Sequence, residues 1–240
     1  MLYKTKGIVL HSIKYSELSL IVKIYTEIYG LQSFIVRSGR SKKNKINASA
    51  FQPLTLLDFV AYHNKKNNLQ NFKEVTGCYQ FSEIPFDIKK SSIVLFIAEV
   101  LNKVIREEEQ NLTLFNYIFN SVKYLDSCTG KVSDFHLIFL TELTKHIGFS
   151  PDINYENNSI FNLYEGRFQP QIPEHSYFIE KDLSKHFYSL LGASFDKMDI
   201  IGFSASTRRD LLNKILDYYK IHLNNFNDIK SLAVLEEIFK

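Results

Sequence analysis

The hydrophobic periodicity of this chain changes near residue 80, and that change limits the folds open to it. Up to Cys78, apolar residues alternate with polar ones or gather in short runs rich in Val, Ile, Tyr and Phe, which is typical of β-strands. After Pro85 they recur at the spacing of amphipathic helices. The sequence therefore predicts an α+β protein with two domains, a β domain over residues 1–80 and a helical domain over residues 81–240.

The strand pattern of the first domain indicates a closed barrel. Five strands are predicted, at residues 7–10, 19–26, 31–36, 54–62 and 69–78. Only the connection between the third and the fourth strand is long. Five strands with the long connection at that place fit the Greek-key barrel of the OB-fold.

The helical pattern of the second domain is interrupted once. Helices are predicted at residues 90–108, 112–125, 132–147, 182–191, 204–223 and 229–239. Ser133 is expected to be the N-cap of the third helix, and Gly148 followed by Pro151 is expected to end it. Between residues 152 and 181, Pro and Gly separate short aromatic runs, so we expect an inserted hairpin or irregular segment in a helical bundle.

Formal charge is divided unevenly between the two domains. Residues 1–80 carry twelve Lys and Arg against four carboxylates, a net charge of +8, whereas the remaining residues sum to −5. The overall charge of +3 therefore hides a basic module joined to an acidic one. Such an asymmetry points to a polyanionic partner.

Two basic segments of the β domain are our candidates for contact with nucleic acid. Their cations are Arg37, Arg40, Lys42, Lys43, Lys45, Lys65 and Lys66. A solvated basic turn is the alternative, but the connection between the fourth and fifth strands is a place where OB-folds often bind nucleic acid. Five aromatic residues could also stack on bases, although most should lie in the core because half of each strand points inward; they are Tyr15, Tyr25, Phe34, Tyr62 and Phe72.

Several short motifs, in this order, resemble one family, the bacterial recombination mediator RecO. They are Gly7-Ile8-Val9-Leu10, then Tyr15, Glu17 and Ser19, Thr26 with Gly30, Gly39-Arg40-Ser41-Lys42, Gln52-Pro53, Ala98-Glu99-Val100-Leu101, Leu114-Phe115 and Gly148-Phe149-Ser150-Pro151. The resemblance covers roughly the first 150 residues and thins after them. It implies an OB barrel joined to a helical domain that binds single- and double-stranded DNA and anneals complementary strands. It also implies that the chain works with RecR to help RecA replace single-stranded DNA-binding protein.

One departure from the family pattern concerns metal. Many members carry a CxxC-based zinc site just after the Gly-x-x-Pro corner, whereas residues 152–158 contain no cysteine. The chain is therefore expected to be a zinc-free variant without a cofactor, in which packing alone holds the insertion. Cys78 and Cys128 lie far apart in the sequence and give no support to a disulfide or a thiolate site.

A second candidate site lies at the start of the helix predicted at residues 204–223. Arg208 and Arg209 occupy its first turn, where the helix dipole disfavours cations, and Phe203 and Leu212 are apolar neighbours. Free N–H groups with two guanidinium groups could bind a phosphate or a terminal carboxylate. Because RecO proteins bind the acidic tail of single-stranded DNA-binding protein, the resemblance names that tail as a candidate. The alternative is that the arginines pair with Asp210, Asp199 or another surface carboxylate.

Enzyme signatures are absent from the sequence. It contains no GxxxxGK[ST], GxGxxG, HExxH or GxSxG motif, and its seven histidines show no ligand or triad spacing. We therefore expect a non-enzymatic protein, and the resemblance to RecO implies a DNA-repair protein in the cytoplasm, associated with the nucleoid and not with a membrane. The alternatives are a general RNA- or single-strand-binding OB module without a role in recombination, and a metal-dependent nuclease.

Overall fold

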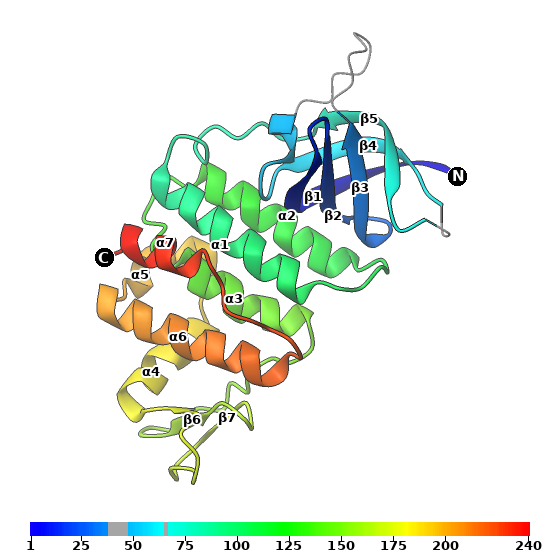
Figure 1. Cartoon of the computed structure of the whole chain (residues 1–240). Coiled ribbons are helices and arrows are strands. Elements are labelled where there is room, and N and C mark those ends of the chain that lie inside the picture. Colours follow the sequence, from blue (N-terminus) through cyan, green and yellow to red (C-terminus); the bar gives the residue numbers. More distant parts are fainter. Residues whose placement is uncertain (38–47, 65–66) are drawn as a thin grey trace. The chain divides into compact units, whose positions relative to one another are not determined.

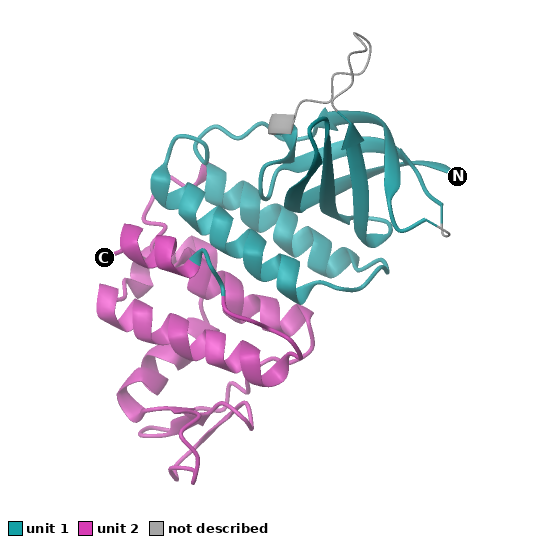
Figure 2. Ribbon diagram, viewed as in Figure 1, with its two compact units in different colours: residues 1–126, 229–231 teal, residues 127–228, 232–240 magenta. Residues whose placement is uncertain are grey.

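A computed structural model gives the structure of the chain and describes residues 1–37, 48–64 and 67–240. These residues form two compact units (Figure 2). The first unit comprises Met1–Asp126 and Ile229–Ser231, and the second comprises Ser127–Asp228 and Leu232–Lys240. Over the described ranges, no helix combines the length and the apolar character needed to cross a membrane.

The first unit begins with a closed five-stranded barrel, which confirms the predicted OB-type fold (Figure 1). Its strands are β1 (Leu2–Ser16), β2 (Ser19–Thr26), β3 (Gly30–Arg37), β4 (Leu56–Tyr62) and β5 (Gln70–Gly77), in the order β1-β2-β3-β5-β4. A short 3-10 helix, Ala48–Phe51, precedes β4. All neighbouring strands are antiparallel except β3 and β5, which pair in parallel at Phe34–Gln70 and Ile35–Asn71.

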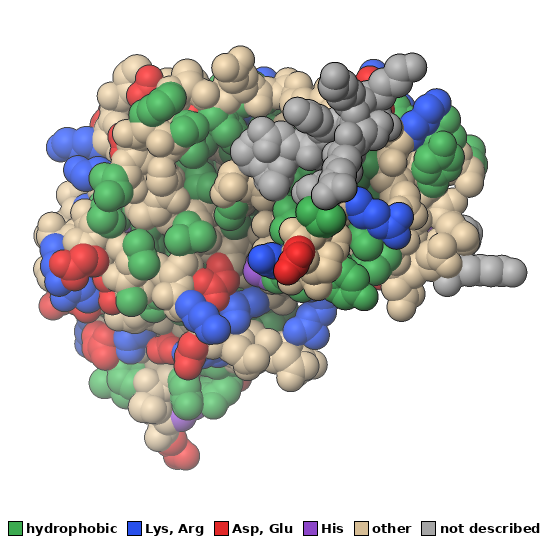
Figure 3. Space-filling model, turned by 45° about the horizontal axis from the view of Figure 1, so that its top comes forward, with side chains coloured by type: hydrophobic (Ala, Val, Ile, Leu, Met, Phe, Trp, Pro, Cys, Tyr) green, Lys and Arg blue, Asp and Glu red, His purple; other side chains and the backbone are tan. Residues whose placement is uncertain are grey.

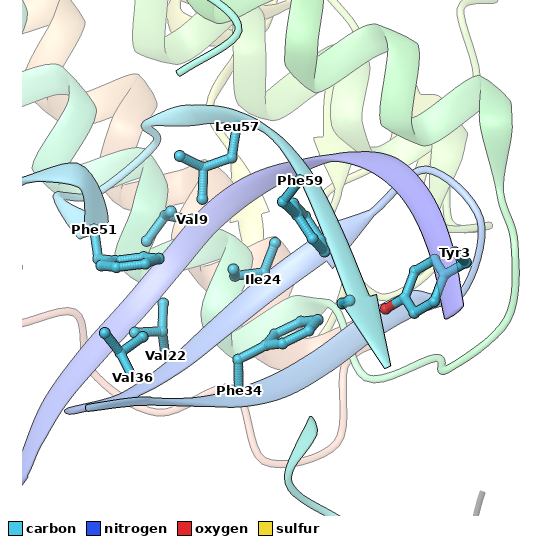
Figure 4. Close-up of a cluster of buried hydrophobic side chains, with 10 residues drawn as sticks. Tyr3, Val9, Val22, Ile24, Phe34, Val36, Phe51, Leu57 and Phe59 are labelled. Carbon is cyan, nitrogen blue, oxygen red and sulfur yellow. The ribbon is translucent and has the colours of Figure 1, made fainter. Parts of the chain in front are cut away.

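Alternation along the strands fills the barrel. Phe34 and Val36 of β3 point inward with Val22 and Ile24 of β2, and all four are at most 2% exposed (Figure 4). Further side chains close the core from β1, β4 and the 3-10 helix: Tyr3, Val9, Leu57, Phe59, Ala61 and Phe51. Because every second residue is buried, the intervening residues of β1, β2 and β3 form an outer face.

Two helices complete the first unit. Helix α1 (Ile88–Val104) begins at Asp87, whose carboxylate accepts hydrogen bonds from the N–H groups of Lys89 and Lys90, and it packs against β1. Helix α2 (Leu112–Ser127) follows. The domain boundary predicted near residue 80 coincides with the change from strands to helices, but the first compact unit extends to Asp126.

Asp126, at the end of α2, binds the segment that follows β5. Its fully buried carboxylate accepts hydrogen bonds from the N–H groups of Ser82, Glu83 and Ile84 and from the hydroxyls of Tyr79 and Ser82. Burial acts to raise the pKa of this carboxyl, but the hydrogen bonds outweigh burial, so that the pKa lies below its usual value. The segment after β5 is thus held in one conformation by a single side chain.

The second unit is a helical bundle with a small sheet. Its helices are α3 (Phe135–His146), α4 (Lys181–Leu191), α5 (Met198–Ile201), α6 (Ala205–His222) and α7 (Leu232–Ile238), with a 3-10 turn at Phe195–Lys197. The Tyr219 hydroxyl of α6 donates to the Leu140 carbonyl of α3 over 2.7 Å. Helix α3 ends at His146, and Gly148 follows it with φ of +88°, as expected for a helix stop of this kind.

The predicted insertion is a three-stranded antiparallel sheet in the order β7-β6-β8. The strands are β6 (Ile160–Asn162), β7 (Arg167–Gln169) and β8 (Phe178–Ile179). The Ser184 hydroxyl of α4 accepts from the Phe161 N–H and donates to the Ile179 carbonyl. Edge-to-face contacts of Phe161 with Phe168 and Phe187 form its core.

Several predicted boundaries are wrong, mainly because residues distant in the chain determine them. The first strand is much longer than residues 7–10 because β1 pairs with β4 through its first half and with β2 through its second. Helix α1 ends at Val104 instead of continuing to residue 108, because the Glu107 carbonyl accepts the Leu31 N–H of β3. Helix α3 begins after Asp134, not Ser133. Helix α7 starts at Leu232 because Glu99 binds the N–H groups of Lys230 and Ser231.

Candidate nucleic-acid interface and helical pocket

The structure places one of the seven predicted phosphate-binding residues. Arg37 is exposed at the end of β3. Arg40, Lys42, Lys43, Lys45, Lys65 and Lys66 lie outside the described residues. Arg37 precedes one basic segment, and Asn64 and Asn67 flank the other. Asn64 and Asn67 share a pocket with Gln32, which lies five residues before Arg37 on β3. Five residues of strand span about 17 Å.

The outer face of β1, β2 and β3 lies between these two places. Strand register sets Ile13 beside Ile21 and Ile21 beside Ile35, and the next row on β2 and β3 holds Lys23 beside Ser33. We call this face, defined by Ile13, Ile21, Lys23, Ser33, Ile35 and Arg37, the sheet platform. Ile13 is 48% exposed. Exposed hydrophobic side chains interspersed with Lys and Arg are visible on the face of the molecule drawn in Figure 3.

The five aromatic candidates divide between core and surface. Tyr25 and Phe34 are buried, and Phe72 is partly buried and stacks on Phe34 with 4.4 Å between ring centroids. Tyr15 and Tyr62 are 64% and 50% exposed. Tyr15 extends from β1 near the sheet platform, whereas Tyr62 pairs with Leu2 on another part of the barrel. Tyr15 and Tyr62 are therefore the aromatic candidates with rings open to a base.

In the second unit, the predicted arginines have different environments. Arg208 donates from Nε to Asp134 Oδ1 over 2.8 Å and from Nη2 to the Phe203 carbonyl over 2.9 Å. Asp134 Oδ2 also accepts the Phe203 N–H at 3.3 Å. The partner of Arg208 is thus a buried carboxylate, not Asp210, Asp199 or another surface acid. Arg209 is exposed and forms no ion pair within the part of the chain that the structure describes.

Arg208 and Arg209 line a pocket together with Leu212, as the sequence suggested, but Phe203 is not part of it. Phe203 is buried and meets the ring of His186 edge-on. Sequence reasoning missed the other walls, which come from α3, from the first residue of α6 and from the C-terminal helix region: His136, Ala205, Leu235, Glu236 and Phe239. The Arg208 guanidinium lies 6.0 Å from the centre of the Phe239 ring.

Electrostatics in this pocket depend on the arginines. His136 is completely buried, and burial together with the nearby Arg208 lowers its pKa to about 3. The imidazole is therefore neutral at ordinary pH. The positive charge of Arg208 is neutralised by its ion pair with Asp134. The other charged residues of the pocket lining are the cation Arg209 and the carboxylate Glu236.

The corner after Pro151, where the resemblance places a zinc site in other members of the family, is held by hydrogen bonds within the chain. The Asp152 carboxylate accepts the backbone N–H of Asn154 at 3.1 Å and its side-chain amide at 2.8 Å. No group of three or more His, Cys, Asp or Glu side chains suited to a metal ion occurs within residues 1–37, 48–64 and 67–240. The residues at this corner therefore do not fit a zinc site.

Comparison with known proteins identifies the family. Residues 1–81 match the family described as "Recombination protein O N terminal", and residues 85–233 match "Recombination protein O C terminal". The chain belongs to the RecO family. Its similarity to individual members extends over full length: it is 39% identical to the DNA repair protein RecO of Bacteroides fragilis and 40% identical to that of Christiangramia forsetii, with all of each chain covered.

Family membership confirms the resemblance drawn from the sequence motifs and makes the chain a member of a DNA-repair family. The RecO protein of Flavobacterium johnsoniae, 40% identical over 245 residues, has the same full coverage. The match between residues 85 and 233 extends well past the point where the sequence motifs thin out. The absence of catalysis, the DNA contacts and the partner proteins remain predictions.

Proposed function

We propose that this RecO-family chain is a DNA-binding recombination mediator. In this proposal, the barrel binds single- and double-stranded DNA and anneals complementary strands. With RecR, the chain helps load RecA onto DNA coated by single-stranded DNA-binding protein. The helical pocket receives the C-terminal tail of that coating protein.

The sheet platform is the observation that carries the DNA-binding proposal. It offers Lys23 and Arg37 for phosphates beside the exposed Ile13 and the half-buried Ile21 and Ile35. The remaining predicted cations lie outside the described residues. Phosphate contacts provide affinity without sequence information, which suits a protein that must act on any strand.

Removal of the basic loop tests this proposal directly. A variant with Ala at Arg37, Arg40, Lys42 and Lys43 should bind single and double strands more weakly. Its dependence of log K on log salt should be flatter by about 0.7 to 0.9 for each phosphate that the variant no longer neutralises. The matched control removes four exposed lysines elsewhere, at Lys89, Lys131, Lys185 and Lys230, and so lowers the net charge equally. An unchanged slope in the loop variant, or an equal change in the control, contradicts the proposal.

Annealing separates a mediator from a general binding module. The mediator should pair complementary oligonucleotides coated with single-stranded DNA-binding protein, and RecR should increase RecA loading on them. Binding without annealing would favour the general RNA- or single-strand-binding module. Magnesium-dependent cleavage of the oligonucleotides would favour a nuclease.

The proposal for the helical pocket is supported by its composition. Leu212, Leu235 and Phe239 give apolar walls, and Arg209 gives a cation without a partner among described residues. The pocket has a volume of only about 20 Å³, so it has to widen to receive an aromatic anchor. An acidic tail needs only such a local positive charge. A long duplex would instead meet the net negative charge of residues 81–240, which is −5 by sequence.

A further inference from the structure

A polar pocket opens at the seam of the barrel where β3 meets β5. The parallel pairing of these strands is limited to two residue pairs, beginning at Phe34 and Gln70. Before that point on β3, Gln32 and Ser33 face the connection that follows β4 instead of a paired strand. The resulting pocket has a volume of about 440 Å³, which lies in the size range of sites for small organic groups.

One wall of the pocket is held rigidly. Gln70 Oε1 accepts the Asn64 N–H at 2.9 Å, and its Nε2 donates to the carbonyls of Asn64 and Asn67 at 3.0 and 2.7 Å. Gln70 itself is 4% exposed. Because its amide group is fully used, Gln70 shapes the wall and leaves recognition to its neighbours.

Those neighbours present hydrogen-bonding groups with no partner among the described residues. The side-chain amide of Gln32 donates to the carbonyls of Tyr29 and Leu31, at 3.1 and 2.9 Å, whereas its Oε1 has no partner among the described residues. The Ser33 hydroxyl and the Asn68 carboxamide are likewise unpaired within the described ranges. The lining therefore offers donors and acceptors side by side, as the edge of a nucleobase requires.

A further wall is aromatic. Tyr29 and His63 stack with 4.1 Å between ring centroids and an interplanar angle of 4°. Tyr3 meets the edges of both rings, at 4.8 and 6.1 Å. His63 Nδ1 is buried and has no hydrogen-bond partner in the described structure, a condition that in proteins is usually relieved by water or a ligand.

The charge of the lining excludes a phosphate and favours a neutral group. Glu108 is the one charged side chain among the described lining residues. A carboxylate repels a phosphate but accepts a hydrogen bond from an exocyclic amine. Ser33 also belongs to the sheet platform, where it is the cross-strand neighbour of Lys23. A strand whose phosphate contacts Lys23 would therefore bring the adjacent base to the mouth of the pocket.

We propose that this seam pocket takes up a single unpaired nucleobase of a bound DNA strand, against the Tyr29–His63 wall and the polar edges of Gln32, Ser33 and Asn68. The inference rests on the proposed binding of DNA by the barrel. It adds a preference for unpaired bases that phosphate contacts cannot provide, and such a preference would favour structures with unpaired bases over perfect duplex during annealing.

The test compares two duplexes that share one strand: in the first the complement pairs perfectly, and in the second the complement carries one extra, bulged 2-aminopurine nucleotide, so that the duplexes differ by a single phosphate. Wild-type protein should bind the bulged duplex about tenfold more tightly, as expected when one base gains stacking and edge contacts. It should also change the fluorescence of the reporter base. Ser33→Tyr, which fills the pocket from a half-buried strand position, should abolish both the preference for the bulged duplex and the change in fluorescence.

Asn71→Tyr is the matched control, because it places the same Tyr side chain on β5 of the same seam but outside the pocket lining. It should retain the preference. A second pocket variant, His63→Phe with Asn68→Ala, keeps an aromatic ring at position 63 and should lose the preference even if Ser33→Tyr fails to fold. Equal binding of both duplexes by wild type overturns the base pocket alone, whereas failure to bind any DNA overturns the proposed function as well.

Discussion

Arg208 Nε lies 2.8 Å from Oδ1 of Asp134, the residue that precedes the first turn of α3, although 74 positions separate the two in the chain. The Asp134 side chain makes no capping hydrogen bond to its own helix and instead binds Arg208 and the Phe203 N–H. Both side chains are largely buried, at 13% and 5% exposed. The pair therefore joins the start of α3 to the start of α6 and fixes one wall of the helical pocket.

We expect Asp134→Asn to destabilise the protein by about 3 kcal/mol, because it leaves the Arg208 guanidinium buried without a counter-charge. Urea unfolding measures the change. The control is Asp228→Asn, which breaks the exposed pair with Lys220 and should change the free energy of unfolding little. Equal effects of the two substitutions would mean that the Arg208–Asp134 pair has no special structural role.

Arg209→Ala should weaken binding of an acidic tail peptide ending in an aromatic residue, since Arg209 is the pocket cation without a partner among described residues. Because Arg209 is exposed, the expected loss is about 1 kcal/mol. The fold should stay intact, unlike that of an Arg208 variant, and the affinity for naked DNA should stay unchanged. Fluorescence anisotropy with a labelled peptide measures the loss. Normal binding of the peptide by Arg209→Ala would show that Arg209 does not contact the tail.

The elements of the fold were predictable because their signals are local. Alternation marks β2 and β3, and helical spacing marks α2 and α4, each within the residues of one element. Boundaries set by distant partners were not predictable. The end of α1 depends on Leu31, and the start of α7 depends on Glu99.

The candidate site was predictable only in part for the same reason. Arg208 and Arg209 could be singled out in the sequence because they lie in the first turn of a predicted helix, where the helix dipole disfavours cations. Asp134, the partner of Arg208, and the pocket wall formed by Phe239 come from elements far away in the chain. Nothing in the residues near Arg208 specifies either of them. Phe203, chosen because it is adjacent in sequence, is not part of the pocket lining and contacts His186 instead.

Asp126→Asn should lower stability near neutral pH by about 3 kcal/mol, because an amide cannot accept the full set of hydrogen bonds that the buried carboxylate accepts. The pKa of Asp126 is depressed in the folded protein, so its stabilisation is present above the ordinary value of 3.8 and is lost as the pH falls through the lower folded pKa. The difference between wild type and variant in urea unfolding should therefore shrink below about pH 4. A difference that does not depend on pH would show that charge is not the cause.

Gly30→Ala should destabilise the barrel by about 2 kcal/mol, through backbone strain and a clash. Gly30 has φ of +59°, and a Cβ there would meet the carbonyl oxygens of Glu107 and Glu109. Gly77→Ala is the control, because Gly77 has open space around the position of a Cβ. Thermal unfolding of both variants checks the expectation, and similar midpoints would show that the segment after α1 can move away from the turn between β2 and β3.

The purified chain should hold no stoichiometric zinc. Where a protein has a structural zinc site, metal binding contributes directly to folding. Here residues 152–158 contain no cysteine, the Asp152 carboxylate is used by Asn154, and the small sheet is closed by Ser184 and by aromatic packing around Phe161. Treatment with a chelator should therefore leave the thermal midpoint unchanged, whereas Phe161→Ala should cost about 3 to 5 kcal/mol because it removes the centre of the sheet's core. Elemental analysis that finds one tightly bound zinc per chain, or a midpoint that falls on chelation, would show that other side chains assemble a metal site in this protein.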